Sequence, residues 1–191
     1  MTTDISLCAV PVFFATSEGQ ARRIADRVAS LLRQEGLDSR PYDMASLAHA
    51  TLDWSGVRAA AVGASIHVGR HQPAAHAFVS ANAGRLNTVP SIFLSVSLAA
   101  ASQHPEEVRK AQELADGFPA ACHWKPRAVA SVAGRLAYTQ YGFITRLLMK
   151  RMARKEGAPT DTSRDYEYTD WETVESLARD LAAQVKARAA A

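Results

Sequence analysis

The chain has 191 residues, 48% of them hydrophobic and 21% charged, with two cysteines and a formal net charge of +3 at pH 7. These values indicate one folded domain and exclude a largely disordered chain, a disulfide-rich scaffold and a paired CxxC metal site. Because the sequence contains no run of roughly 20 apolar residues and no cleavable leader, we expect a cytoplasmic protein. We expect neither a metal ion nor a nucleic acid as a partner.

Apolar runs alternate with helical patterns in the first part of the chain. The run at 7–15 predicts a buried strand because it is continuous rather than alternating. Pro11 removes a ladder donor from that strand, so we expect a local adjustment there. A helix is expected from Gly19 to Glu35, ended by Gly36, and 37–44 is expected to be a shorter strand.

The same alternation continues to the end of the chain. Further strands are expected at 57–66, 90–98 and 127–134, and further helices at 73–83, at Pro105 to Gly117, and from Thr169 or Asp170 onward. Five strands alternating with helices predict an α/β fold, a five-stranded parallel sheet with helices on both faces. Since no repeat or linker divides the pattern, we expect a single domain over 1–191.

The turn after the first strand, residues 16–21, is the first candidate site. Open α/β sheets bind ligands at the carboxyl ends of their strands. Backbone N–H groups at the start of the next helix, with the hydroxyls of Thr16 and Ser17, suit a phosphate. The GxxxxGK[ST] and GxGxxG motifs are both absent, which favours a monophosphate. An ordinary N-cap at Thr16 or Ser17 explains the turn equally well.

Two long segments follow the third and fourth strands, at 63–73 and 95–105. Long loops at this edge of the sheet indicate binding. Gly63 and Gly69 allow close approach of the backbone. The apolar side chains that could contact a flat ring are Ile66, Val68 and Leu98, and the hydroxyls that could contact its polar edge are Ser65, Ser95 and Ser97. With the turn at 16–21, they predict a site for a planar cofactor that carries one phosphate.

Five strings of the sequence also resemble a known family. They are "ATSEGQARRIA", "GASIHVGRHQPAAHAFV", "LNTVPSIFLSVSL", "WKPRAVASVAGRLAY" and "YTDWETV". From about Val12 to Leu181 they are similar, in the same order, to the flavodoxin-like quinone-dependent protoporphyrinogen oxidases of bacterial haem biosynthesis. The resemblance implies a flavodoxin-like fold, one bound FMN, and oxidation of protoporphyrinogen IX to protoporphyrin IX with electrons passed to a membrane quinone.

The resemblance also implies which residues bind FMN. The family's phosphate loop corresponds to 15–21 and its isoalloxazine loops to 64–72 and 95–102. The implied cofactor-binding residues are Thr16, Ser17, Glu18, Gly19, Gln20, Ala21, Ser65, Ile66, His67, Val68, Gly69, Ser95, Val96, Ser97 and Leu98. Ala15 and Ala21 stand where the family has a Ser and a Thr. Two hydrogen-bond donors are therefore missing, so we expect FMN to bind more weakly or to depend on Ser17 and on backbone amides. An alternative is that this chain is a relative of the family that has lost FMN.

The segment from Arg135 to Thr162 has no place in a minimal five-stranded flavodoxin, and the family has a long insertion at the same position. Apolar residues at helical spacing and crowded cations predict an interfacial helix on an anionic membrane surface. The expected membrane- and quinone-facing residues are Phe143, Ile144, Leu147, Leu148, Lys150, Arg151, Arg154 and Lys155. This implies a peripheral protein on the cytoplasmic face of the inner membrane. A solvated basic helix docked on the sheet, or a contact in a homo-oligomer, remains an alternative.

The sequence identifies no catalytic residue. His67 and His71 are candidate proton shuttles, and with His76 they loosely suggest a metal site, but exposed non-catalytic histidines are the preferred interpretation. Candidate partners for the substrate's propionates are Arg70, Arg135 and Arg146.

Two other functions stay open. One is a small electron-transfer flavodoxin, which the insertion and a sequence pI near 9.0 disfavour, because carriers usually present an acidic surface to a basic partner. The other is an FMN-dependent NAD(P)H:quinone reductase, for which the sequence offers no evident nicotinamide site.

Overall fold

The secondary structure follows the alternation that the sequence predicts. The computed structural model describes residues 3–139, 142, 147, 150, 151, 153, 154 and 159–190. Its strands are β1 (Thr3–Ser6), β2 (Val10–Ala15), β3 (Ser39–Asp43), β4 (Ala50–Asp53), β5 (Ala60–His67), β6 (Arg70–His71), β7 (Ser91–Ser97), β8 (Ala128–Ala133), β9 (Arg135–Leu136) and β10 (Tyr166–Glu167). Its helices are α1 (Gln20–Gln34), α2 (Pro73–Leu86), η1 (Ala99–Ala101), α3 (Pro105–Ala121) and α5 (Trp171–Ala190).

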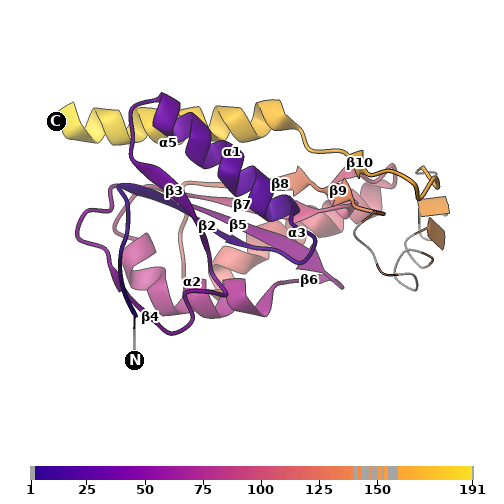
Figure 1. Ribbon diagram of the computed structural model, residues 1–191, viewed down its shortest axis with the longest axis horizontal. Coiled ribbons are helices and arrows are strands. Elements are labelled where there is room, and N and C mark those ends of the chain that lie inside the picture. Colours follow the sequence, from indigo (N-terminus) through magenta and orange to yellow (C-terminus); the bar gives the residue numbers. More distant parts are fainter. Residues whose placement is uncertain are drawn as a thin grey trace.

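The central sheet has the strand order β3-β2-β5-β7-β8, and every neighbouring pair is parallel. Helices α1 and α5 cover one face, and α2 and α3 cover the other (Figure 1). This confirms the predicted α/β fold. The order places β2 beside β3 on one side and β5 on the other, so the chain reverses direction across the sheet at the end of β2, where ligands bind in such folds.

Strand β2 shows why a continuous apolar run forms an interior strand. Successive side chains point to opposite faces, so Val12 and Phe14 pack into the α1/α5 cluster while Phe13 and Ala15 pack into the α2/α3 cluster. The adjustment expected at Pro11 is also visible, since the pairing of β2 with β5 begins only at Val12. Pro11 is in register with β3 alone, and its missing N–H removes no bond from the β2–β5 pairing.

Three local features differ from the sequence predictions. The pair β1–β4 was not predicted, because these short polar segments lack an apolar run. Residues 66–71 form an antiparallel hairpin of β5 and β6 rather than an open loop. Helix α3 continues past Gly117, where we expected it to end, because Phe118 and Pro119 are buried in its last turn. Of the two predicted caps for α5, Asp170 accepts hydrogen bonds from the N–H groups of Glu172 and Thr173.

The segment expected to be an insertion leaves the sheet after β8. Strands β9 and β10 pair in antiparallel fashion at its base, with Leu136 opposite Tyr166. Beyond this pair the described part of the segment lies past the end of the sheet (Figure 1). A small apolar cluster lies there, made by Leu136, Ala137, Tyr138 and Ala153. Within the described part of the chain, no helix is long and apolar enough to cross a membrane.

Candidate functional site

The turn between β2 and α1 forms one side of the site. Gly19 has a left-handed backbone with φ of 82°, and its N–H donates to Thr16 Oγ1 over 2.9 Å. Thr16 thus accepts the N–H just ahead of α1, as the N-cap alternative expected, while no side chain caps the first turn of the helix itself. The N–H groups in the first turn of a helix have no intrahelical partner. They are therefore available to an anion at the end of β2.

Hydroxyl groups line the same turn. Gln72 Nε2 donates to Ser17 Oγ at 2.5 Å and lies 3.4 Å from Ser65 Oγ, so the residue before α2 bridges the phosphate turn and β5. Both Thr16 and Ser17 accept hydrogen bonds in this arrangement. Each keeps its own O–H as a donor for a ligand.

Glu18 and His67 face each other across the mouth. The carboxylate of Glu18 lies 3.4 Å from His67 Nδ1, which joins the phosphate turn to the end of β5. Both belong to the predicted cofactor-binding set. The turn therefore carries a carboxylate near the expected phosphate, with the His67 imidazole beside it.

The tip of the β5–β6 hairpin has two residues with positive φ, Val68 at 50° and Gly69 at 72°. This is the backbone of a two-residue hairpin turn, in which glycine is favoured. A Cβ at Gly63 would meet Ala21 O at 3.9 Å, an ordinary contact, so the protein's own packing does not require glycine there. The expected close approach of Gly63 to a ligand stays a prediction. Val68 is 86% exposed at the tip, while Ile66 is half-buried nearer the sheet.

The end of β7 supplies the third side of the site. Ser95, Val96 and Ser97 lie within the strand predicted at 90–98 and are buried, so the candidate segment 95–105 begins inside β7. Ser97 Oγ accepts from Ala100 N–H and so holds the short helix η1. Leu98 packs against the apolar cluster of the insertion, so the candidate ring-contacting segment also touches that region.

The predicted histidines separate into different environments. His71 is not solvent-exposed, which corrects the preferred interpretation. Its ring contacts Phe118 and Phe93, and burial lowers its pKa to about 4. His67 pairs with Glu18 and His76 is exposed on α2. The described residues hold no group of three metal-ligating side chains.

A polar network joins the phosphate turn to the base of the insertion. Gln20, only 5% exposed, donates from Nε2 to Glu167 Oε1 and to Thr169 Oγ1, both at 2.8 Å. Arg23 donates to the oxygen of the same amide and to Glu167 Oε2. Thr169 in turn donates to Ala133 O. Sequence reasoning placed Gln20 at the cofactor but gave no sign of this role, because its partners lie far along the chain.

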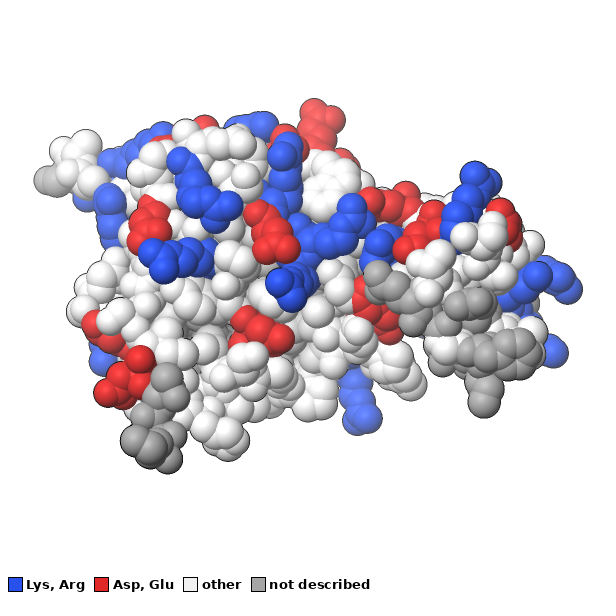
Figure 2. Space-filling view, viewed as in Figure 1, with Lys and Arg blue, Asp and Glu red and all other residues white. Residues whose placement is uncertain are grey.

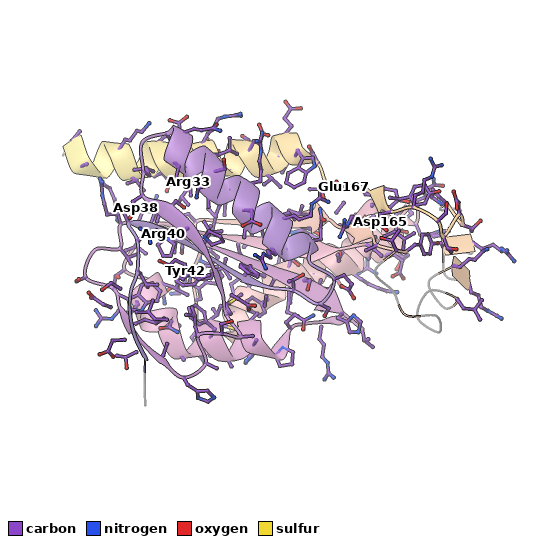
Figure 3. The ribbon with its side chains drawn as sticks, in the orientation of Figure 1. Arg33, Asp38, Arg40, Tyr42, Asp165 and Glu167 are labelled. Carbon is purple, nitrogen blue, oxygen red and sulfur yellow. The ribbon has the colours of Figure 1, made fainter. Side chains whose placement is uncertain are left out.

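Arg135 forms a salt bridge with Asp165 at the base of the insertion. Its Nη1 lies 3.3 Å from Asp165 Oδ2, and both side chains are largely buried. Burial raises the pKa of Asp165, but hydrogen bonds from Thr139 and the charges of Arg135 and Arg23 outweigh it and lower the pKa. Figure 3 shows Asp165 and Glu167 at the junction of the sheet and the insertion. Of the three arginines predicted for propionates, Arg70 is exposed beside the mouth and Arg146 lies outside the described residues.

The outer part of the insertion is partly described. Leu147, Lys150, Arg151 and Arg154 are helical, and Leu147 is 61% exposed. Phe143, Ile144, Leu148 and Lys155 lie outside the described residues. Figure 2 shows Lys and Arg side chains at the outer end of this region.

A separate hollow of about 450 Å³ lies along α2, lined by side chains such as Met44, Leu47, Trp54, Phe78 and Arg85. None of the predicted cofactor-binding residues lines it. The candidate site is therefore the mouth at the carboxyl ends of β2, β5 and β7, which the sheet topology selects.

Residues 11–163 match the family described as a flavodoxin domain. The chain belongs to the flavodoxin domain family. It is also 34% identical over 172 residues to the protoporphyrinogen IX dehydrogenase [quinone] of Escherichia coli K12, covering 90% of this chain and 93% of that protein. Membership of this family implies FMN as the cofactor.

Two solved structures share the fold of this flavodoxin-family chain. The rubredoxin oxygen:oxidoreductase of Desulfovibrio gigas superposes with a TM-score of 0.57 at 15% identity, over 95% of this chain and 37% of that one. The chain thus spans little more than a third of that protein. The flavodoxin of Streptococcus pneumoniae TIGR4 gives 0.50 at 16% identity, over 92% and 98%. At these identities the likeness shows the fold alone.

The donors at the mouth fit the phosphate of FMN. The first turn of α1 is uncapped, Gly19 has the left-handed backbone of the turn, and Thr16 and Ser17 retain hydroxyl donors. Ala15 and Ala21 are fully packed, at 2% and 0% exposure. The two positions that lack a hydroxyl therefore contribute to the core, and the donors left for a phosphate are backbone amides and the remaining hydroxyls.

Proposed function

We propose that this protein is an FMN-dependent dehydrogenase that oxidises protoporphyrinogen IX to protoporphyrin IX and passes the electrons to a membrane quinone. The observation that carries the proposal is the 34% identity to the Escherichia coli enzyme of that name across 90% of the chain. The match includes more than a common fold, since it extends over nearly the full length of both proteins.

The residues of the mouth have distinct parts in this proposal. The amides of residues 16–21 and the hydroxyls of Thr16 and Ser17 bind the phosphate. Ile66 and Val68 from the hairpin and Leu98 after β7 hold the ring, while Ser65, Ser95 and Ser97 lie on the strands that border it. Bound FMN supplies hydride acceptance, and the protein supplies placement and exclusion of water.

In this proposal the insertion binds the membrane surface and contacts the quinone. Leu147, Arg151 and Arg154 are helical, and all three are exposed. Cations near an anionic bilayer each contribute about 1 kcal/mol of attraction at low salt. Leu98 connects this region to the mouth through the apolar cluster of Leu136 and Tyr138. The insertion would thus bring the flavin site to the surface where quinone resides.

The enzymatic proposal is tested on the purified protein in two steps. The absorption spectrum first establishes whether flavin copurifies. An anaerobic assay then supplies protoporphyrinogen IX with a quinone, and in parallel NADH with the same quinone. The proposal expects porphyrin fluorescence to appear only with protoporphyrinogen IX. Oxidation of NADH instead would identify an NAD(P)H:quinone reductase, and turnover of neither substrate would favour an electron carrier.

The membrane proposal is tested by charge removal. Changing Lys150, Arg151, Arg154 and Lys155 to Gln should weaken binding to anionic liposomes by orders of magnitude at low salt, since about 4 kcal/mol of attraction is lost. FMN content and reduction of a soluble acceptor should be unchanged, while oxidation with a long-tailed quinone in vesicles should fall. Equal liposome binding by the two proteins would instead assign these cations to a solvated helix face.

A further inference from the structure

His71 occupies an unusual place for a histidine in a hairpin. It lies on β6, directly opposite Ile66 in the antiparallel pair with β5. Its Nε2 is 2.9 Å from Ser95 Oγ, and Ser95 is completely buried two residues before the end of β7. One side chain therefore links the two segments that are predicted to border the flavin ring.

Aromatic side chains hold the His71 ring on its other sides. The ring centroid is 4.6 Å from that of Phe118 on α3 and 5.4 Å from that of Phe93 on β7. Phe93 and Phe118 themselves stack at 4.8 Å. The imidazole thus has a position set by a helix and a strand, and its hydrogen bond to Ser95 does not depend on the exposed tip of the hairpin.

We propose that His71 is a positioning residue of the flavin site, which orients the Ser95 hydroxyl and sets the spacing between the β5–β6 hairpin and the end of β7. The inference rests on FMN binding at this mouth, and it does not depend on the identity of the substrate. No contact between His71 and FMN is required, because the histidine acts through Ser95 and through Ile66.

The chemistry of a neutral imidazole explains why histidine suits this position. Burial keeps the ring neutral at pH 7, and a neutral imidazole has one N–H donor and one lone pair. If Nε2 donates, the Ser95 hydroxyl accepts and its O–H stays available to another group. If Nε2 accepts, the Ser95 O–H points at the imidazole and only its lone pairs stay available. In both cases the hydrogen bond fixes the orientation of the hydroxyl. The nearby titratable side chains of Arg70 on β6 and His76 on α2 are both exposed.

The competing interpretation is that His71 only fills space between two phenylalanines. Two substitutions separate these roles. His71→Phe keeps an aromatic ring against Phe93 and Phe118 but removes the hydrogen bond. His71→Gln keeps a hydrogen-bonding group but removes the ring. His76→Phe is the matched control, since His76 also faces the Phe118 ring, at 6.3 Å, from an exposed position.

The experiment measures FMN dissociation constants on apoprotein by flavin fluorescence, with the visible flavin spectrum, its midpoint potential and the thermal midpoint of the apoprotein. His71→Phe should weaken FMN binding about two- to tenfold, the range of one net hydrogen bond, and should shift the spectrum and potential. His71→Gln should bind FMN better than His71→Phe, yet unfold at a lower temperature. His76→Phe should match the wild type in all four measurements.

A double-mutant cycle with Ser95→Ala checks the route of the effect. If His71 acts through Ser95, adding His71→Phe to Ser95→Ala should weaken FMN binding no further. Fully additive losses, or an unchanged dissociation constant, spectrum and potential in His71→Phe, would overturn the proposal. Should His71→Phe fail to fold, His71→Leu, which also lacks a hydrogen-bonding group, takes its place in the cycle under the same criterion. A wild-type protein that binds no FMN would refute the cofactor site itself, whereas FMN binding without protoporphyrinogen oxidation would refute only the proposed substrate.

Discussion

The parallel sheet and the insertion are held by different kinds of contact. The sheet carries two large clusters of buried apolar side chains, one on each face. The base of the insertion has a two-residue strand pair, one small apolar cluster around Leu136 and Tyr138, and several polar contacts, among them Arg135 with Asp165. Because segments with few buried apolar contacts open at lower free energy, the insertion should open while the sheet stays folded. Four substitutions or conditions test this difference.

The largest effect is expected from the sheet. Phe13 is fully buried and its ring contacts those of Tyr42, Trp54 and Phe78. Phe13→Ala should lower the free energy of unfolding by about 3–5 kcal/mol, through lost burial and a residual cavity. Denaturant titration followed by circular dichroism measures this value. A loss below 1 kcal/mol would contradict the view that apolar burial carries the sheet.

A smaller and more local effect is expected at Gln20. Gln20→Leu removes both 2.8 Å hydrogen bonds to the base of the insertion and leaves Glu167 and Thr169 with one partner fewer. We expect a cost of about 1–3 kcal/mol, seen mainly as faster proteolysis within the insertion. Arg27→Leu is the control, since Arg27 is on the same helix but pairs with Glu175 on α5. Equal proteolysis of both variants would argue against the network.

Substitutions in the turn at Gly19 and Thr16 test the mouth independently of the polar network at the base of the insertion. A β-branched residue at a φ of 82° is strained by roughly 1–2 kcal/mol. Gly19→Val should therefore distort the turn and weaken FMN binding strongly, and Thr16→Val should also weaken it by loss of a donor. Proteolysis of the insertion should stay at the wild-type rate in Thr16→Val. Unchanged flavin content in both variants would show that the phosphate binds elsewhere.

Lowering the pH should destabilise the base of the insertion before it destabilises the sheet. The expected effect is smaller than those of the substitutions above. The folded-state pKa of Asp165 lies below its usual value of 3.8, because hydrogen bonds from Thr139 and the charge of Arg135 outweigh burial. Its stabilising contribution is present above pH 3.8 and is lost as the pH falls through the lowered folded-state pKa. Pepsin cleavage within the insertion should rise over that range, and Asp165→Asn should show a flatter dependence. Parallel curves for the two proteins would exclude this carboxylate as the cause.

Much of the fold was predictable because its signals are local. The apolar run of β2, the helical periodicity of α1 and the cap at Asp170 each depend on residues within a few positions of one another. The three segments of the candidate site, whose binding of FMN stays a prediction, were likewise predicted from the ends of strands. Their internal conformations were not, since the hairpin at 66–71 forms only through its pairing with β5.

The sequence by itself determined the alternation of strands and helices, the family, and the segments that meet at the mouth, because hydrophobic period and short motifs are properties of neighbouring residues. Only the tertiary structure decided that His71 is half-buried against Phe118, that Gln20 reaches Glu167 across 147 positions, and that Arg135 pairs with Asp165. A side chain's burial and its distant partners depend on how the elements pack. No local pattern in the chain encodes them.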